Sequence, residues 1–370
     1  MRLPRRRRTP PTIGVVVPAY DVAALLPACL DSLLAQTHRE LDVVVVDDGS
    51  PDESGEIAEA YAARDFRVRV VHTDNHGLGA ARNEGLRHVG GDFVAFADSD
   101  DVVPPEAYAT LVRTLERTGS DLVSGSIVRW EGEALVEPGW MRRFHDPARL
   151  ATTAADHPRI LGDVFAWNKL YRRTFWEAAG LSWPEGVRYE DQPTLTRAYL
   201  GATAFDVVPD VVYHWRIRAD GTSITQQRSS LADLRDRHLT KRMSLDSVEA
   251  YVAGGGPAHV RETFLREVLP GDLHRYFVEI PGCTDAWWTL LVAMVRDLWS
   301  GRSLADTTMT PVQRLTGWLV EHDRRDQATA VMAWVAEHRR PLPRSADGAY
   351  VEVPGVDLSD VDPVARRASP

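Results

Sequence analysis

Short apolar runs alternate with helical patterns over the first third of the chain. The runs at 12–17, 41–46, 67–71 and 93–96 are rich in β-branched and aromatic residues, which predicts buried strands. Between the first two runs, apolar residues recur at the spacing of a helix over 25–34. The alternation predicts an α/β fold with a mostly parallel sheet, because strands covered on both faces are apolar almost throughout.

Polar residues follow three of these predicted strands. Tyr20 comes after the first, Asp47 and Asp48 end the second, and three acids within 98–101 follow the fourth. A parallel sheet binds its ligands outside the carboxyl ends of its strands. We therefore expect these side chains to meet at one edge of the sheet and to form a site there.

The acids at 98–101 repel one another if they lie together at the end of a strand. A divalent cation would neutralise them, and carboxylate oxygens suit Mg²⁺ or Mn²⁺. The alternative is a polar loop whose acids cap the helix that begins near Pro104. Taken alone, this run leaves both interpretations open.

Gly77 and Gly79 stand at the predicted start of another helix. A third glycine is missing and the pair follows the third strand, so a dinucleotide-binding fingerprint is not expected. Small residues at this place allow a helix N-terminus to approach a ligand phosphate. Close packing explains them equally well.

The composition limits the classes of protein that fit. The 370 residues are 44% hydrophobic, which suffices for one large domain or two modest ones. The formal net charge is −10 and the basic residues are scattered beyond the N-terminus, which argues against a nucleic-acid partner. Cys29 and Cys283 lie far apart without further metal ligands nearby, so we expect neither a zinc site nor a disulfide framework, and a cytoplasmic location fits. No apolar run approaches the roughly 18–20 residues of a membrane span.

The two ends of the chain differ from its centre. Residues 1–11 contain five arginines and predict a disordered tail, with peripheral contact to an anionic membrane surface as the alternative. Residues 341–370 are rich in Pro, Ser, Asp and Arg and predict a tail of extended segments.

A helical module is predicted over 231–340. Its tryptophans lie among apolar neighbours and are expected in a core, with an acceptor-binding or oligomer-forming surface as the alternative. The helical patterns cover 231–252, 260–269, 286–299 and 312–337.

Four segments carry a family resemblance, and they lie within the predicted domain 12–230. The chain resembles family 2 glycosyltransferases over about residues 12–225, on motifs in the family's order and spacing. The resemblance implies the GT-A fold, a Rossmann-like nucleotide-binding domain, and an inverting transferase that uses a nucleotide-diphosphate sugar, expected to be UDP-linked. The motifs are VVVPAY at 15–20, VVDDGS at 45–50, GLGAARN at 77–83 and FADSDD at 96–101.

The resemblance assigns the first motifs to the nucleotide. Pro18 and Tyr20 would line the base pocket, with Tyr20 stacking on the ring. Asp48 would accept a hydrogen bond from the base N–H, and Asp47 would support it. Arg82 would lie near the base or the diphosphate.

The resemblance assigns the fourth motif to the metal and the sugar. Asp98 and Asp100 match the DxD motif, with Asp100 as the more direct ligand of Mn²⁺ or Mg²⁺. Asp98 would contact the ribose or the sugar and is the second candidate ligand. Ser99, between them, belongs to the same donor-binding segment.

A Glu-Asp pair and an upstream aromatic segment carry the remaining chemistry that the resemblance implies. Asp191 matches the general base of the family, and Glu190 beside it would belong to the sugar or acceptor pocket. The alternative is an N-cap followed by a first-turn proline. Trp167 and Asn168 would shape the same pocket, although a tryptophan in the core explains the pattern equally well.

The segment 213–225 resembles loops that close over the donor diphosphate in related transferases. Arg216, Arg218 and Ser223 would hold phosphate oxygens, and His214 is a further candidate metal ligand. The alternative is a strand followed by a loop whose arginines lie in solvent.

The acceptor remains open among a glycan, a polyol-phosphate, a lipid-linked and a small-molecule hydroxyl. A non-catalytic nucleotide-sugar-binding scaffold is one rival, which the acids at Asp100 and Asp191 argue against. A sugar nucleotidyltransferase is the other, and it would need a glycine-rich basic segment after the first strand, where this chain has residues 18–21.

Overall fold

The computed structural model describes residues 10–217 and 230–368 and divides the chain into two compact units. The first unit comprises residues 1–156 and 163–219, and the second comprises 157–162 and 220–370. A short segment from the first half of the chain, residues 157–162, thus belongs to the second unit.

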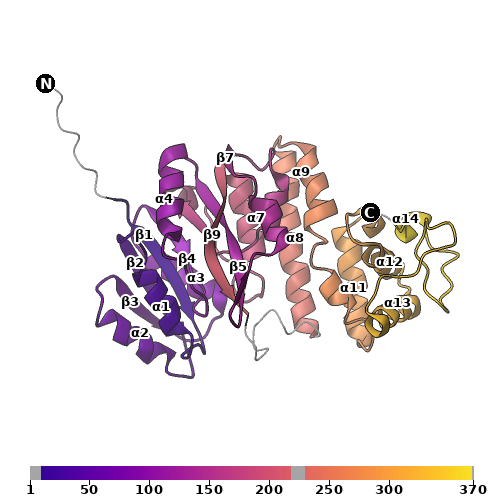
Figure 1. Cartoon of the computed structure of the whole chain (residues 1–370), viewed down its shortest axis with the longest axis horizontal. Coiled ribbons are helices and arrows are strands. Elements are labelled where there is room, and N and C mark those ends of the chain that lie inside the picture. Colours follow the sequence, from indigo (N-terminus) through magenta and orange to yellow (C-terminus); the bar gives the residue numbers. More distant parts are fainter. Residues whose placement is uncertain (1–9, 218–229, 369–370) are drawn as a thin grey trace. The chain divides into compact units, whose positions relative to one another are not determined.

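Nine strands of the described residues form one sheet in the first unit (Figure 1). The order along the sheet is β3-β2-β1-β4-β8-β5-β9-β7, with β6 paired to β5. The pairs β3–β2, β2–β1, β1–β4 and β5–β9 are parallel, while β8 runs antiparallel to both β4 and β5. The strands are β1 Ile13–Ala19, β2 Leu41–Asp48, β3 Val68–Thr73, β4 Phe93–Phe96, β5 Leu122–Glu131, β6 Ala134–Val136, β7 Arg149–Thr152, β8 Lys169–Arg172 and β9 Phe205–Arg216.

Both faces of the sheet are covered by helices, which is why β1 is buried at every position. Val15 and Val17 belong to the core that contains residues of α1, α2 and α4. Val16 lies on the opposite face beneath α3, and a Cβ at Gly85 would approach its side chain to 2.3 Å. The helices are α1 Leu26–Leu34, α2 Ser54–Ala62, α3 Leu78–His88, α4 Ala107–Thr118, α5 Gly139–His145, α6 Arg173–Ala178 and α7 Asp191–Gly201.

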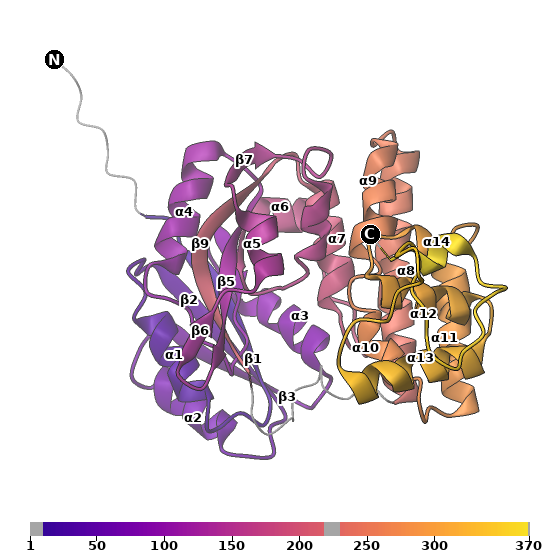
Figure 2. The same cartoon turned by 45° about the vertical axis from the view of Figure 1, so that its right-hand side comes forward.

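The named elements of the second unit are all helical (Figure 2). The pattern at 312–337 is two helices, because the chain turns at Asp323, whose φ of 57° is left-handed. The elements are the 3₁₀ turns η1 Pro158–Gly162 and η4 Leu304–Asp306, the π-helical turn η3 Phe264–Val268, and α8 Leu231–Ala253, α9 Ala258–Thr263, α10 His274–Phe277, α11 Asp285–Leu298, α12 Pro311–Glu321, α13 Arg325–His338 and α14 Pro363–Arg366.

The tryptophans of this unit lie in its core, as the sequence predicts. Five tryptophans lie within 231–340, and each is at most 8% exposed, namely Trp287, Trp288, Trp299, Trp318 and Trp334. The segment 341–370 corrects the prediction of a tail, because its described part packs within the unit. Leu358 and Val361 are buried, and Arg314 Nη2 donates to Arg367 O at 2.7 Å.

Over the described residues, no helix is both long enough and apolar enough to cross a membrane.

Candidate active site

The carboxyl ends of β2, β1 and β4 lie side by side at one edge of the sheet. Ala19 pairs with Asp47 at the ends of β1 and β2, and Val16 pairs with Phe96, so the residues that follow each strand emerge together. Tyr20 is 48% exposed, and Asp21 beside it has a left-handed φ of 51°. The structure therefore brings the predicted aromatic and the predicted acids to a common edge, with a free aromatic face for a ligand.

Asp48 organises the loop that leads into α3. It is 4% exposed, and its carboxylate accepts hydrogen bonds from Gly77 N at 2.8 Å, from His76 N at 2.9 Å and from the Thr73 hydroxyl at 3.2 Å. A base N–H would therefore have to share oxygens that already accept from the loop. Its position at the edge agrees with a base-pocket residue, and its contacts add a structural role that the sequence did not indicate.

Asp47 supports the same edge from the other side of β2. Its Oδ1 accepts from Ser50 N at 3.0 Å, and its Oδ2 lies 2.8 Å from His72 Nδ1. Burial raises the pKa of Asp47, but the hydrogen bonds from Ser50 and His72 outweigh it and leave the pKa below its ordinary value. Asp47 is thus held as a carboxylate.

Glycine is required at the two positions before and within α3 for different reasons. Gly77 has a φ of 87° and open space beside it, so it supplies a left-handed turn before the helix. A Cβ at Gly79 would lie 2.1 Å from Pro184 O. For Gly79 the structure decides in favour of close packing, which presses the start of α3 against the segment leading to α7.

Arg82, on the same helix, joins two of the predicted motifs. Its Nη2 donates to Asp98 Oδ1 at 2.8 Å, and its Nη1 donates to Glu190 Oε1. The guanidinium is 2% exposed and lies 5.0 Å from the ring of Trp183. Burial lowers the pKa of Arg82, but Asp98 and Glu190 outweigh it, so the pKa is raised and the side chain is always charged. Trp183 is a site residue that no motif signalled.

The acid run forms a tight turn after β4. Asp101 N donates to Asp98 O at 3.1 Å, Asp98 N donates to the Tyr213 hydroxyl at 2.9 Å, and Ser99 is buried. Burial raises the pKa of Asp101, and Asp100 and Asp98 raise it further, so the acids do act on one another. The alternative of a helix cap does not hold, because α4 begins at Ala107 without a side-chain cap.

The donor set fits a hard divalent cation. Asp98 and Asp100 are both part-exposed carboxylates beside the buried Asp101, and a cation relieves such mutual repulsion. Within residues 10–217 and 230–368, no three His, Cys, Asp or Glu side chains gather closely enough to hold a metal by themselves. A cation here would therefore take further oxygens from a bound ligand.

The end of β9 runs beside the acid turn. Arg216 N donates to Asp101 Oδ1 at 2.7 Å, and Arg216 Nε donates to Asp100 O at 2.8 Å. His214 is half-buried, pairs with Val102 through the backbone, and has a pKa lowered by burial. Arg216 thus fastens the acid turn, a role that the sequence did not indicate. Arg218 and Ser223 lie outside the described residues.

Glu190 and Asp191 stand where α7 begins. Asp191 is its first residue, and its Oδ1 lies 2.7 Å from Gln192 N. Tyr189, just before the pair, has a left-handed φ of 63°, a conformation that costs energy for a bulky residue. Burial raises the pKa of Glu190, which Arg82 opposes. The surrounding structure therefore fixes both acids at the helix start.

Trp167 and Asn168 are both buried, and their place in the sugar or acceptor pocket stays a prediction. Trp167 is 6% exposed and stacks on Tyr213 with ring centroids 4.1 Å apart. Asn168 is fully buried, and its amide donates to Gly125 O at 2.8 Å. For Trp167 this burial agrees with the alternative of a core tryptophan.

A buried polar network surrounds Asn168. Lys169 Nζ lies 2.9 Å from Asp163 Oδ1, and both side chains are fully buried. Burial lowers the pKa of Lys169, while Asp163 and, more weakly, Asp191 oppose the shift. Lys169 therefore places a cation within electrostatic reach of Asp191. No motif indicated Lys169. The one signal that could have done so is a lysine within a largely apolar segment.

Comparison with known proteins agrees with the geometry. The family model "Glycosyl transferase family 2" matches residues 14–177. The glycosyltransferase EpsJ of Bacillus subtilis is 31% identical over 244 residues, which is 63% of this chain and 67% of EpsJ. The glycosyltransferase GlyG of Streptococcus pneumoniae is 30% identical over 241 residues, which is 60% of this chain and 76% of GlyG. The chain belongs to glycosyltransferase family 2.

The fold of this family 2 member is shared by a solved structure. The crystal structure of Staphylococcus aureus TarS residues 1–349 with UDP-GlcNAc superposes with a TM-score of 0.72 at 21% identity, covering 93% of this chain and 97% of that one. The predicted GT-A fold is thereby confirmed. In sequence, full-length TarS, a poly(ribitol-phosphate) β-N-acetylglucosaminyltransferase, is 28% identical over 69% of this chain and 43% of its own length.

Proposed function

We propose that this chain transfers a sugar from a UDP-linked donor to an acceptor hydroxyl, with inversion at the anomeric carbon. The observation that carries the proposal is the position of Arg82, whose guanidinium binds Asp98 of the DxD motif and Glu190 beside the candidate base. One buried cation thereby links the turn after β4 to the start of α7, which supports a site where two substrates are held in a fixed relation.

The donor is proposed to lie along the edge formed by β2, β1 and β4. The exposed ring of Tyr20 would stack on uracil, and the loop ordered by Asp48 would close the base pocket. Asp98 and Asp100 would hold Mn²⁺ or Mg²⁺, which when bound supplies charge stabilisation to the departing diphosphate. Arg216, fastened to the acid turn, would approach the same phosphates, and Arg218 and Ser223 are proposed to join it.

Asp191 is proposed as the general base. A carboxylate at the start of a helix is stabilised by the helix dipole, and it can take the proton of a hydroxyl that attacks from the face opposite the diphosphate. Glu190 is already paired with Arg82, which is why we propose Asp191 and not Glu190 for this role. For His214 we propose no role other than that of a further candidate metal ligand.

For the acceptor we propose a hydroxyl of a cell-surface polymer, with polyol-phosphate polymers as the first class to test. TarS, which shares the fold, is named for a poly(ribitol-phosphate) acceptor and was solved with UDP-GlcNAc. Peripheral membrane contact through residues 1–11, mostly outside the described residues, and self-association through the second unit are further predictions. They are tested by vesicle flotation and light scattering.

The deciding experiment measures UDP and UDP-GlcNAc binding by calorimetry, with and without Mn²⁺. Wild type is compared with Asp100→Ala and with Glu133→Ala, an exposed acid of the same unit. We expect metal-dependent binding that Asp100→Ala loses and Glu133→Ala keeps. The absence of binding of both UDP and UDP-GlcNAc would refute the proposed UDP-sugar site, and binding without transfer to any tested acceptor would favour a nucleotide-sugar-binding scaffold.

A further inference from the structure

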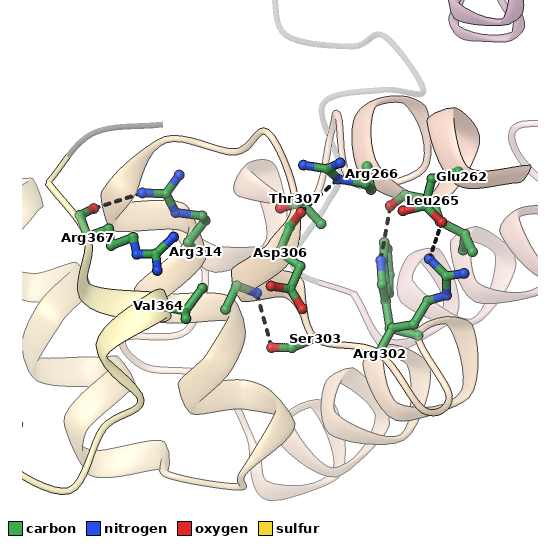
Figure 3. A pocket seen from close by; sticks show the side chains of 12 residues that line it. Glu262, Leu265, Arg266, Arg302, Ser303, Asp306, Thr307, Arg314, Val364 and Arg367 are labelled. Atoms are coloured by element: carbon green, nitrogen blue, oxygen red, sulfur yellow. Dashed lines mark hydrogen bonds and ion pairs between the residues drawn. The ribbon is translucent and has the colours of Figure 1, made fainter. Parts of the chain in front are cut away.

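A pocket of about 460 Å³ in the helical unit has a lining that includes Arg266, Arg302, Arg314 and Arg367 (Figure 3). Its hydrogen bonds join parts of the helical unit to one another. Arg302 Nη1 pairs with Glu262 at 2.6 Å, and Arg314 Nη2 donates to Arg367 O at 2.7 Å. A buried cation of the first unit, Lys169, has contacts of another kind.

Lys169 is held by three acceptors at the start of β8. It is fully buried, and its Nζ lies 2.9 Å from Asp163 Oδ1. The same nitrogen donates to Asn168 Oδ1 at 2.7 Å and to Phe165 O at 2.8 Å. Three acceptors need three N–H donors, which the ammonium form has, whereas a neutral amine has two. The hydrogen bonds of Lys169 therefore require a charged side chain in a fixed position.

Asp163 is the anion of this buried network. Its Oδ2 accepts hydrogen bonds from the hydroxyls of Ser124 and Tyr199 and lies 3.4 Å from His145 Nε2. Burial raises the pKa of Asp163, but the charge of Lys169 and the contacts with His145 and Ser124 outweigh it, so the pKa is lowered. Asp163 is thus an ionised carboxylate that binds residues of several elements at once.

Tyr199 joins the network to α7. Its hydroxyl donates to Asp163 Oδ2 at 3.2 Å, and its ring centroid lies 5.6 Å from Lys169 Nζ, a cation–π contact. Asp191 is the first residue of the same helix, about two turns or ~12 Å before Tyr199. Since α7 is continuous between them, a network that holds Tyr199 also fixes the position of Asp191.

The charge of Lys169 acts on Asp191 as well. Lys169 on β8 and Arg82 on α3 both lie within electrostatic reach of Asp191. So does Tyr171, which is neutral because burial raises its pKa well above its ordinary value. Arg82 is shared by two carboxylates, one of them the adjoining Glu190, whereas Lys169 forms an ion pair with one carboxylate of the described part of the chain.

We propose that Lys169 is a positioning residue for the transfer reaction, which fixes α7 through Tyr199 and supplies positive charge that keeps Asp191 ionised. A fully buried ion pair loses much of its Coulomb energy to desolvation and adds little stability over apolar packing. Its place beside the helix that begins at Asp191 is explained by this role. The inference rests on the proposed function, because a general base must be ionised to take a proton.

The first test follows the ionisation of Asp191 by ¹³C NMR in the full chain labelled at its aspartate carboxyl carbons. Asp191→Asn identifies the resonance, and Lys169→Met removes the charge of the lysine while keeping a long side chain. We expect the midpoint of the Asp191 titration to rise by about half a pH unit or more in Lys169→Met, because a nearby cation favours the carboxylate. An unchanged midpoint overturns the proposal.

Lys241→Met is the matched control. Lys241 is 1% exposed, and its Nζ lies 2.6 Å from Asp272 Oδ1, so the helical unit contains an equally buried lysine with the same kind of partner. Both variants should lower the melting temperature, but Lys241→Met should leave the midpoint of the Asp191 titration where it is. An equal rise in both variants would report general loosening of the protein and overturns the proposal.

Tyr199→Phe tests the link to α7 even if Lys169→Met does not fold. It removes the hydroxyl that binds Asp163 and keeps the ring. Amide hydrogen exchange over residues 191–195 should become about five-fold faster or more, as expected for the loss of one hydrogen bond that holds the helix. Exchange at the wild-type rate overturns the proposal.

Transfer kinetics separate this inference from the proposed function. With UDP-GlcNAc and a ribitol-phosphate oligomer, kcat should fall about ten-fold or more in Lys169→Met, with KM for the donor within two-fold. An unchanged kcat in a folded Lys169→Met overturns the role of the lysine. If the wild type transfers no sugar, the proposed function fails with these substrates, while the Asp191 titration and the exchange at α7 still decide whether Lys169 controls that residue.

Discussion

Arg82 donates from Nη2 to Asp98 Oδ1 at 2.8 Å, although the two residues lie on different elements, α3 and the turn after β4. The arginine is 2% exposed and the aspartate side chain 27%, so a buried cation holds a carboxylate that reaches the surface. The other half of the guanidinium binds Glu190. One side chain thus connects three segments of the candidate site, namely α3, the turn after β4 and the start of α7.

Arg82→Gln is expected to destabilise the protein by roughly 3–5 kcal/mol, because it leaves the buried Glu190 without its cation. Urea unfolding of the wild type and the variant measures this. Transfer activity should fall with it even at temperatures where the variant is folded, since Asp98 and Glu190, the neighbour of Asp191, lose their common partner.

The matched control for that change is Arg87→Gln on the same helix. Arg87 is 67% exposed and pairs with Glu84 at the surface, so its loss should cost less than about 1 kcal/mol. Equal destabilisation by the two substitutions would contradict the importance of the buried bridge.

Tyr20→Ala should weaken UDP binding without weakening the fold. A stacked aromatic contributes about 1–3 kcal/mol, which corresponds to roughly a 5- to 150-fold higher dissociation constant. Calorimetry with UDP and Mn²⁺ measures it, and Phe66→Ala is the control, since Phe66 is 94% exposed. An unchanged affinity in Tyr20→Ala would remove Tyr20 from the base pocket.

Asp191→Asn should lower the transfer rate by about 10²–10⁴-fold. The affinity for UDP should stay within two-fold, because a substitution away from the nucleotide should change the free energy of UDP binding by no more than ~0.4 kcal/mol. Rates are measured with saturating donor, so that binding and chemistry separate. Asp156→Asn, an exposed acid of the same unit, is the reference. A loss of donor binding equal to the loss of rate would assign Asp191 to the donor pocket instead.

The contact between His72 and Asp47 should make stability depend on pH. Hydrogen bonds to Asp47 and then Glu59 raise the pKa of His72 above its ordinary value of about 6.5. The contribution of His72 to the free energy of unfolding is therefore fully present below about pH 6.5, and it is lost as the pH rises through the raised pKa of the folded protein. His72 is about half exposed, so the effect should stay below about 1 kcal/mol.

Unfolding free energies of the wild type and His72→Gln at about pH 5.5 and 8.5 check this prediction. The difference between the two proteins should be seen at the lower pH and vanish at the higher. Asp47 has a depressed pKa, so its ionised form stabilises the fold at any pH above its pKa in the unfolded chain. This stabilisation is lost only as the pH falls through the depressed value. A difference that grows with pH would contradict the assignment.

Much of the edge formed by β2, β1 and β4 could be predicted because the relevant signals are local. An apolar run that ends in an acid encodes both a buried strand and a residue at its carboxyl end, and the parallel sheet then brings Tyr20, Asp47 and Asp98 together. The family motifs supplied the roles that pattern alone could not. The buried hydrogen bonds of Asn168 could not be predicted, since nothing local reports what partner an amide will find in the folded chain.

The sequence by itself determined the alternation of strands and helices, the position of the acids at strand ends and the helical nature of the second unit. These follow from periodicity, which is a property of neighbouring residues. Only the tertiary structure decided that Arg82 bridges Asp98 and Glu190, that Gly79 packs against Pro184, and that arginines far apart in the sequence line one pocket. Those relations join residues far apart in the chain, and they are fixed by packing and charge in three dimensions, which no local pattern records.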